Sequence, residues 1–232
     1  MKTIGLIGGM SWESSSVYYQ LINREVQKRL GGVHSAKILM YSLDFAEMSG
    51  ALQPDGNWAD TADRLITAGA TLAKGGADFL LICSNSMHLL SEEVEKGAGI
   101  PLLHIADPLG EKILLSSARR VGLIGTTTTM EKPSVISGRL QQKFGIECLI
   151  PAAPDRTALH RIIIDELVRG QFLDVSRAAC NQIDDELVRR GAEGIILGCT
   201  EFPILLRTGD CTVPLFDTTA LHALAAVDLA LA

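Results

Sequence analysis

Two short polar motifs of this 232-residue chain carry the residue types that could move a proton. Ser84 follows a buried apolar run in the first half, and Cys199 follows a similar run in the second half. A thiol has a reference pKa of about 8.5 and can act as a base near neutral pH, whereas a hydroxyl is a far weaker acid. Two such groups on opposite sides of one carbon could remove a proton from one face and return a proton to the other. That is the chemistry of racemisation.

The two motifs belong to an internal repeat. Three segments recur in the same order in the second half: 5–8 at 122–125, 76–86 at 191–201, and 101–103 at 214–216. Their nearly constant offset predicts two similar halves, which we place at residues 1–107 and 108–217. The closing segment, residues 218–232, is expected to be a helix that packs on the first half.

Short apolar runs alternate with longer amphipathic stretches along the chain. Four of the runs in the first half are predicted to be buried strands: Thr3–Ile7, Lys37–Leu43, Asp78–Cys83 and Leu102–Ile105. Helices are predicted over Tyr18–Arg29, after the serines Ser14, Ser15 and Ser16 that can cap it, and over Trp58–Lys74, which two glycines follow. A third amphipathic helix is predicted around residues 159–169. The alternation favours an α/β fold in which each half is a mostly parallel four-stranded sheet flanked by helices.

The expected sheets also indicate where a ligand would bind. In open α/β sheets, ligands lie beyond the carboxyl ends of the strands. Four polar loops follow apolar runs at that edge: 8–11, 83–86, 125–129 and 198–201. We therefore expect an active site in a cleft between the halves, with Ser84 on one wall and Cys199 on the other.

At these motifs the chain resembles a known family. Gly-Leu-Ile-Gly-Gly-Met (5–10), Ser-Asn-Ser-Met-His (84–88), Gly-Thr-Thr-Thr-Thr-Met (125–130) and Gly-Cys-Thr-Glu (198–201) resemble the aspartate/glutamate racemases. The resemblance covers essentially the whole chain. It implies racemisation of acidic amino acids by two-base proton transfer at Cα, with no pyridoxal phosphate, metal or other cofactor.

The resemblance also assigns roles to the two motifs. It makes Cys199 the thiolate base and Ser84 mainly the acid, at a position where family members usually carry a second cysteine. Cys83 lies one residue too early to replace it, because strand alternation turns neighbouring side chains to opposite faces. Relatives with a hydroxyl here are expected to favour one direction of the reaction.

Further residues of the same loops are candidates for substrate binding or support. Candidates for binding are Met10, Gln53, Asn85, Ser86, Thr126 and Thr200. His88 is expected to support Ser84, and Glu201 to orient or polarise Cys199. Each candidate has an ordinary structural alternative: the small polar residues are also good helix caps, and a lone cysteine is most often a buried hydrophobe. A helix N-terminus can cap and bind a carboxylate at once.

Composition and charge exclude several functional classes. With 21 basic and 27 acidic residues, the net charge is −6, and no dense Lys/Arg run is present, which argues against nucleic acid or a membrane surface as partner. The glycine-rich start does not match G-x-G-x-x-G, and no CxxC or HxxxH pair indicates a metal site. Five scattered cysteines and an N-terminus unlike a signal peptide predict reduced thiols and a cytoplasmic protein.

Other activities share the expected fold. A maleate isomerase or malonate-type decarboxylase would use related cysteine chemistry, and a non-catalytic protein would only bind a dicarboxylate or an amino acid. In each case the partner is a small molecule. The oligomeric state stays open, with a homodimer as one option.

Overall fold

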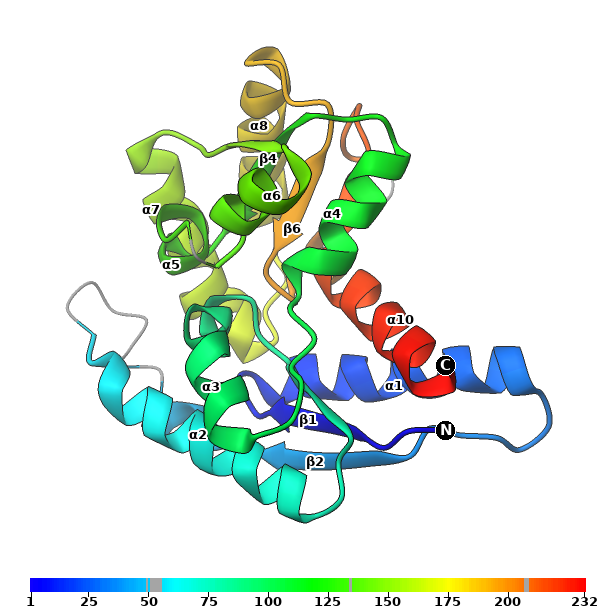
Figure 1. The fold of residues 1–232 in the computed structure, drawn as a ribbon. Coiled ribbons are helices and arrows are strands. Elements are labelled where there is room, and N and C mark those ends of the chain that lie inside the picture. The colour runs from blue at the N-terminus through cyan, green and yellow to red at the C-terminus, as the bar shows by residue number, and fades with distance from the viewer. Residues whose placement is uncertain (49, 51–55, 134, 207–208) are drawn as a thin grey trace. The chain divides into compact units, whose positions relative to one another are not determined.

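Figure 1 shows the computed structural model of the chain, which describes residues 1–48, 50, 56–133, 135–206 and 209–232. The chain divides into two compact units. Unit 1 comprises Met1–Ile105 and His222–Ala232, and unit 2 comprises Ala106–Leu221. Within the described residues, no helix combines the length and apolar character that crossing a membrane requires.

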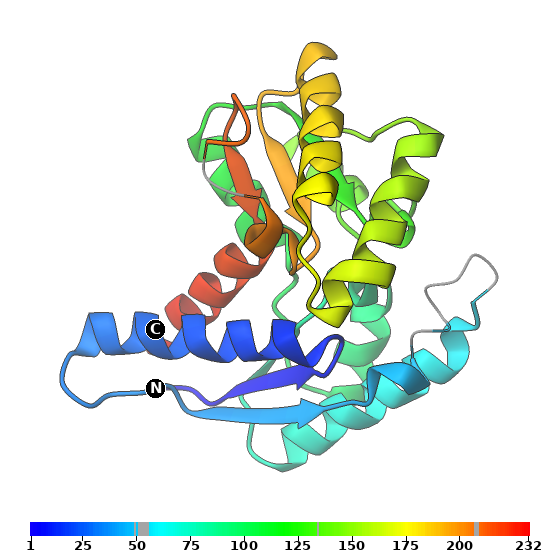
Figure 2. The same ribbon diagram turned by 180° about the vertical axis from the view of Figure 1, so that it is seen from behind.

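Unit 1 is built on a parallel sheet of three strands in the order β2-β1-β3. The strands are β1 (Ile4–Gly8), β2 (Ile38–Ser42) and β3 (Phe79–Ile82). The helices are α1 (Trp12–Leu30), α2 (Trp58–Lys74), α3 (Ser91–Ala98) and α10 (Thr218–Leu231), with short 3₁₀ turns η1 (Phe45–Glu47) and η3 (Ser86–Leu90). α1 lies on one face of the sheet and α2 on the other, as Figure 2 shows from behind.

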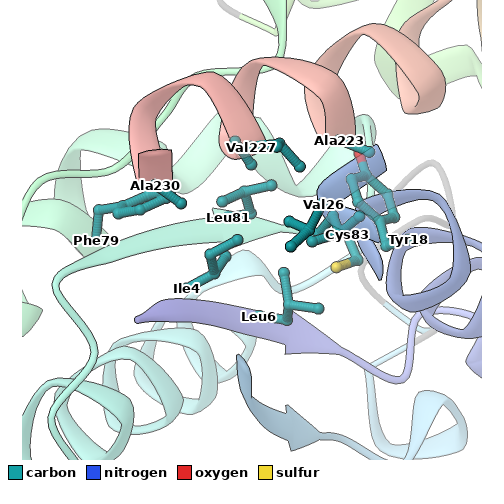
Figure 3. Packing of buried hydrophobic residues seen from close by; sticks show 12 residues of the cluster. Ile4, Leu6, Tyr18, Val26, Phe79, Leu81, Cys83, Ala223, Val227 and Ala230 are labelled. Carbon is teal, nitrogen blue, oxygen red and sulfur yellow. The ribbon is translucent and has the colours of Figure 1, made fainter. Parts of the chain in front are cut away.

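Strand alternation sorts the apolar side chains of unit 1 into two layers. One layer gathers side chains of β1, β3, α1 and α10. Figure 3 labels ten of its members: Ile4, Leu6, Tyr18, Val26, Phe79, Leu81, Cys83, Ala223, Val227 and Ala230. Leu80 points the other way, since a Cβ added at Gly69 of α2 would lie 3.2 Å from its side chain. The end of α10 therefore completes the core of unit 1 although it is the last part of the chain.

The prediction of a fourth strand in the first half, at Leu102–Ile105, is wrong. This stretch forms one isolated parallel bridge, Leu80 to Leu102, and then leaves the sheet. The backbone N–H of Leu103 still donates to the Leu80 carbonyl at 2.9 Å. The N–H of Ile105 instead donates to a side chain, Nε2 of His88, so the ladder cannot continue. Among its described residues, unit 1 consequently has a sheet of three strands where four were expected.

Unit 2 has the expected parallel sheet of four strands, in the order β5-β4-β6-β7. The strands are β4 (Arg120–Gly125), β5 (Glu147–Leu149), β6 (Ile195–Gly198) and β7 (Leu215–Asp217). The helices are α4 (Ala106–Leu115), α5 (Thr127–Glu131), α6 (Ser137–Phe144), α7 (Ala153–Arg161), α8 (Asp174–Arg189) and α9 (Phe202–Leu205). α7 continues into a π turn, η4 (Ile162–Glu166), and a 3₁₀ turn, η5 (Leu167–Arg169).

Candidate active site

Ser84 and Cys199 occupy equivalent positions beyond two equivalent strands. Strands β1 and β4 carry the Gly-Leu-Ile-Gly repeat, and each pairs in parallel with the strand that leads to the candidate residue. The register pairs matching points of the repeat: Ile7 with Ile82, and Ile124 with Leu197. Two residues beyond these partners come Ser84 and Cys199. Each half therefore presents its candidate side chain at the carboxyl end of the strand next to its glycine-rich strand.

The loop after β1 is folded tightly against the start of α1. Gly9 has φ +91°, and a side chain there would collide with the Leu43 backbone, so only glycine fits. Its N–H donates to Oγ of Ser15 at 2.7 Å. Ser11 caps α1 by accepting from a backbone N–H of the first turn. Met10, between these two anchored positions, is buried, so its backbone is held firmly in place.

Ser84 is half-buried, and hydrogen bonds anchor the backbone on both sides of its side chain. The carbonyl of Cys83 accepts a hydrogen bond from Oγ of Ser14 at 3.0 Å, which ties the end of β3 to the first turn of α1. The carbonyl of Ser84 itself accepts from Nδ1 of His88 at 2.7 Å. His88 thus supports Ser84 through its backbone. Cys83 points into the core of unit 1 (Figure 3), and burial raises the pKa of its thiol, so it is an inert packing residue.

The small polar candidates divide between capping and other roles. Thr126 caps α5 by accepting from the N–H of Thr129 at 3.2 Å. Asn85 and Ser86 are buried where η3 begins, and the Asn85 side chain does not cap that turn. Gln53 lies outside the described residues. Thr126 therefore acts as a helix cap, the structural alternative given for it above. Asn85 is not a cap and remains a candidate for substrate binding.

Cys199 is paired with a carboxylate. Its Sγ lies 3.0 Å from Oε2 of Glu201 and donates to it, and Oγ1 of Thr200 donates to the same oxygen at 2.7 Å. All three side chains are buried. Burial and the neighbouring negative charge of Glu201 raise the pKa of the Cys199 thiol well above its usual value. The sequence led us to expect a thiolate; the surroundings favour a thiol whose proton already points at an acceptor.

Comparison with known proteins identifies the family of this chain. The family model described as Asp/Glu/Hydantoin racemase matches residues 7–226. This chain belongs to that family. A solved structure described as a "putative Asp/Glu Racemase" from Yersinia pestis is 46% identical, with all of both chains covered and a TM-score of 0.90.

Two further relatives support the same assignment. The aspartate racemase homologue PH1733 from Pyrococcus horikoshii OT3 is 31% identical over the whole of both chains, with a TM-score of 0.81. The broad specificity amino-acid racemase RacX of Bacillus subtilis (strain 168) is 23% identical, covering 99% of this chain and 98% of its own length. The protein is thus a racemase of the Asp/Glu type, an isomerase, built on the expected α/β fold.

Two further residues of this racemase have surroundings that the sequence did not indicate. Oε2 of Glu13, in the first turn of α1, is buried and has no hydrogen-bond partner among the described residues. His160 of α7 accepts the N–H of Thr127 on Nδ1 at 3.3 Å, and burial lowers its pKa, which favours the neutral ring. Neither residue lies in a recognisable motif. The features that single them out, a buried carboxylate oxygen and a buried ring, depend on how the chain folds around them. In the part of the chain that is described, no three His, Cys, Asp or Glu side chains form a group able to hold a metal ion.

Proposed function

We propose that this racemase interconverts the enantiomers of an acidic amino acid, aspartate or glutamate, by proton transfer at Cα without a cofactor. The observation that carries the proposal is the Cys199 thiol, which donates to the buried carboxylate of Glu201 at 3.0 Å. A thiol with its own proton acceptor is an activated base. Ser84, at the equivalent position of the other half, is the second proton-transfer group.

The reaction of the L-enantiomer follows from these two groups. Sγ of Cys199 takes the Cα proton while the proton of the thiol passes to Glu201. The Cα–H electron pair stays on the substrate and spreads into its α-carboxylate. Ser84 then gives its hydroxyl proton to the opposite face of Cα, which yields the D-enantiomer and a serine alkoxide. Solvent returns a proton to Ser84 and removes the extra proton from Glu201, so the starting state is restored.

The substrate's charged groups need partners of opposite character. Backbone N–H groups of the loops, together with Asn85 and Ser86, offer donors for the α-carboxylate and stabilise the charge that develops on it, as in an oxyanion hole, whereas the Thr200 hydroxyl is engaged by Glu201. The α-ammonium group needs an acceptor, and Glu13 supplies a carboxylate with a buried oxygen that has no hydrogen-bond partner among the described residues. Glu13 lies in the first turn of α1, just after the loop that holds Met10. The next residue, Ser14, donates to the Cys83 carbonyl at the end of β3, next to Ser84.

The test is an assay of the purified protein with both enantiomers of aspartate and glutamate in deuterated buffer. A racemase converts each enantiomer into the other and incorporates deuterium at Cα. A decarboxylase would instead release carbon dioxide from a malonate, and an isomerase of maleate would yield fumarate. Binding of these acids without exchange or turnover would mean a binding protein and would refute the proposal.

A further inference from the structure

Three histidines form a buried cluster in unit 1 that the proton transfer itself does not use. Their exposed fractions are 1% for His88, 6% for His104 and 0% for His222. The ring centroid of His88 lies 4.8 Å from that of His104 and 5.5 Å from that of His222. The three rings come from η3, from the stretch after the isolated bridge, and from α10. Buried polar rings need hydrogen-bond partners, and these partners reveal what the cluster does.

The partners of His88 determine its tautomer. A carbonyl can only accept, so Nδ1 must carry a proton to bind the Ser84 carbonyl at 2.7 Å. A backbone N–H can only donate, so Nε2 must be bare to accept from Ile105 at 3.2 Å. His88 is therefore neutral. Its ring connects the backbone of Ser84 to the backbone of Ile105, in the stretch that leaves the sheet.

His222 holds the same stretch from the other side. Its Nε2 donates to the Leu103 carbonyl at 2.8 Å, two residues before the amide that His88 accepts. Its Nδ1 lies 2.9 Å from the hydroxyl of Tyr18, and the ring centroids of these two residues lie 5.6 Å apart with their planes at 87°. Tyr18 belongs to α1, the helix whose first turn also binds the end of β3.

We propose that His88, His222 and Tyr18 are positioning residues for Ser84, a role that rests on the proposed function. The chain of contacts runs from α1 through Tyr18 and His222 to Leu103, and from Ile105 through His88 to the Ser84 carbonyl. Together with the bond from Ser14 to the Cys83 carbonyl, it fixes the backbone on both sides of Ser84. Because His88 binds the carbonyl of Ser84, the network acts on Ser84 through its backbone, and we expect its effect to be on the placing of the Ser84 hydroxyl.

The experiment compares two rates that depend differently on Ser84. Exchange of the Cα hydrogen of an L-substrate, with return to the same face, needs only Cys199 and Glu201. Conversion into the D-enantiomer also needs the Ser84 hydroxyl. Loss of the positioning network should therefore slow racemisation and spare the exchange, so the ratio of exchange to racemisation measures the placing of Ser84.

The first variants alter His88. His88→Leu removes both hydrogen bonds and should slow racemisation of L-aspartate or L-glutamate by about 100-fold, the contribution of one general acid. His88→Asn keeps a side-chain N–H near the Nδ1 position and should recover at least about tenfold of that loss. His34→Leu, at an exposed histidine, is the control and should leave both rates unchanged.

The second pair of variants changes a single atom. Tyr18→Phe removes only the hydroxyl that binds His222 and should slow racemisation about fivefold, with the exchange rate unchanged. Tyr19→Phe is the matched control, because Tyr19 is the next residue of α1 and is 52% exposed. This pair keeps the test decisive if His88→Leu fails to fold.

The outcomes separate the two proposals. A raised ratio of exchange to racemisation in the His88 and Tyr18 variants supports the positioning network. An unchanged ratio, or equal loss of both rates in folded protein, overturns it while leaving the proposed function in place. A parent protein that neither racemises nor exchanges overturns the proposed function itself.

Discussion

Asp184 of α8 is a buried carboxyl whose removal should stabilise the protein at neutral and alkaline pH. Its exposed fraction is 2%, and its Oδ1 has no hydrogen-bond partner among the described residues. Burial, and secondly the negative charge of Asp185, raise the pKa of Asp184 from 3.8 to about 7. Asp184→Asn replaces the carboxyl with an uncharged group of the same shape, so the difference between the two proteins isolates the effect of the charge.

The magnitude follows from the pKa of Asp184. A pKa difference of about three between the folded and unfolded states corresponds to roughly 4 kcal/mol. Because the folded pKa is the higher one, the folded state keeps a proton that the unfolded state loses between about pH 4 and pH 7. Stability of the parent therefore falls as pH rises through that window. The stability that Asp184→Asn gains over the parent should be about 2 to 3 kcal/mol larger near pH 8.5 than near pH 5.

Urea unfolding of both proteins at a series of pH values measures this difference. Glu111→Gln is the control: it removes an exposed carboxylate of another helix, α4, and should change stability by less than about 0.5 kcal/mol. A gain for Asp184→Asn that does not vary with pH would refute the reasoning, since the ionisation of Asp184 would then carry no penalty in the folded state.

Four further predictions concern the proposed reaction. Cys199→Ser should lower racemisation by at least about 100-fold with an unchanged circular dichroism spectrum, and near-parental turnover would remove Cys199 from the mechanism. In the parent, the L-enantiomer should turn over faster than the D-enantiomer at saturating substrate; Ser84→Cys should bring the two rates closer, and equal rates in the parent would contradict the division of roles. Glu201→Gln should speed alkylation of Cys199 by iodoacetamide, because the charge that raises the thiol pKa is gone, yet slow racemisation about 100-fold; faster racemisation would mean that Glu201 only suppresses the thiolate. Glu13→Gln should raise KM for amino acids about tenfold and leave binding of the corresponding dicarboxylates without an amino group unchanged, whereas equal loss of both would deny Glu13 an ammonium contact.

The elements that hydrophobic periodicity defines could be predicted from the sequence. The helix Trp58–Lys74 is confirmed at both ends, since Asn57 caps its start and Gly75 follows its end. The start of the first helix was predicted too late. Ser14 and Ser15 looked like caps, but they lie within α1 and bind the ends of β3 and β1 through their hydroxyls. A serine near a helix start serves equally well as a cap and as a tertiary donor, and the local sequence does not distinguish the two.

The state of the candidate site could be predicted only in part. The repeat correctly matched Ser84 with Cys199, because the pairing of β-strands follows the same register in both halves. The thiolate expected at Cys199 is not what its surroundings favour. Ionisation depends on burial and on the direction of the Glu201 side chain, and both are set by the turn after β6. The same limit applies to Leu102–Ile105. Its apolar pattern is typical of a strand, but the N–H of Ile105 binds the ring of His88 and not a neighbouring strand.

The two halves share the strand register that leads to Ser84 and to Cys199, but they surround these two residues with different chemistry. In unit 2, Glu201 binds Sγ of Cys199, the atom that reacts in the proposed mechanism; in unit 1, His88 binds the backbone carbonyl of Ser84. A partner on the reacting atom can take its proton, whereas a partner on the backbone can only place it. Ser84 should therefore give a proton far more readily than it removes one, which is the physical source of the expected bias. Because the equilibrium constant of a racemisation is one, kcat/KM must be equal for the two enantiomers. The bias must then raise kcat and KM together for the L-enantiomer, so it becomes visible at saturating substrate and vanishes at low concentration.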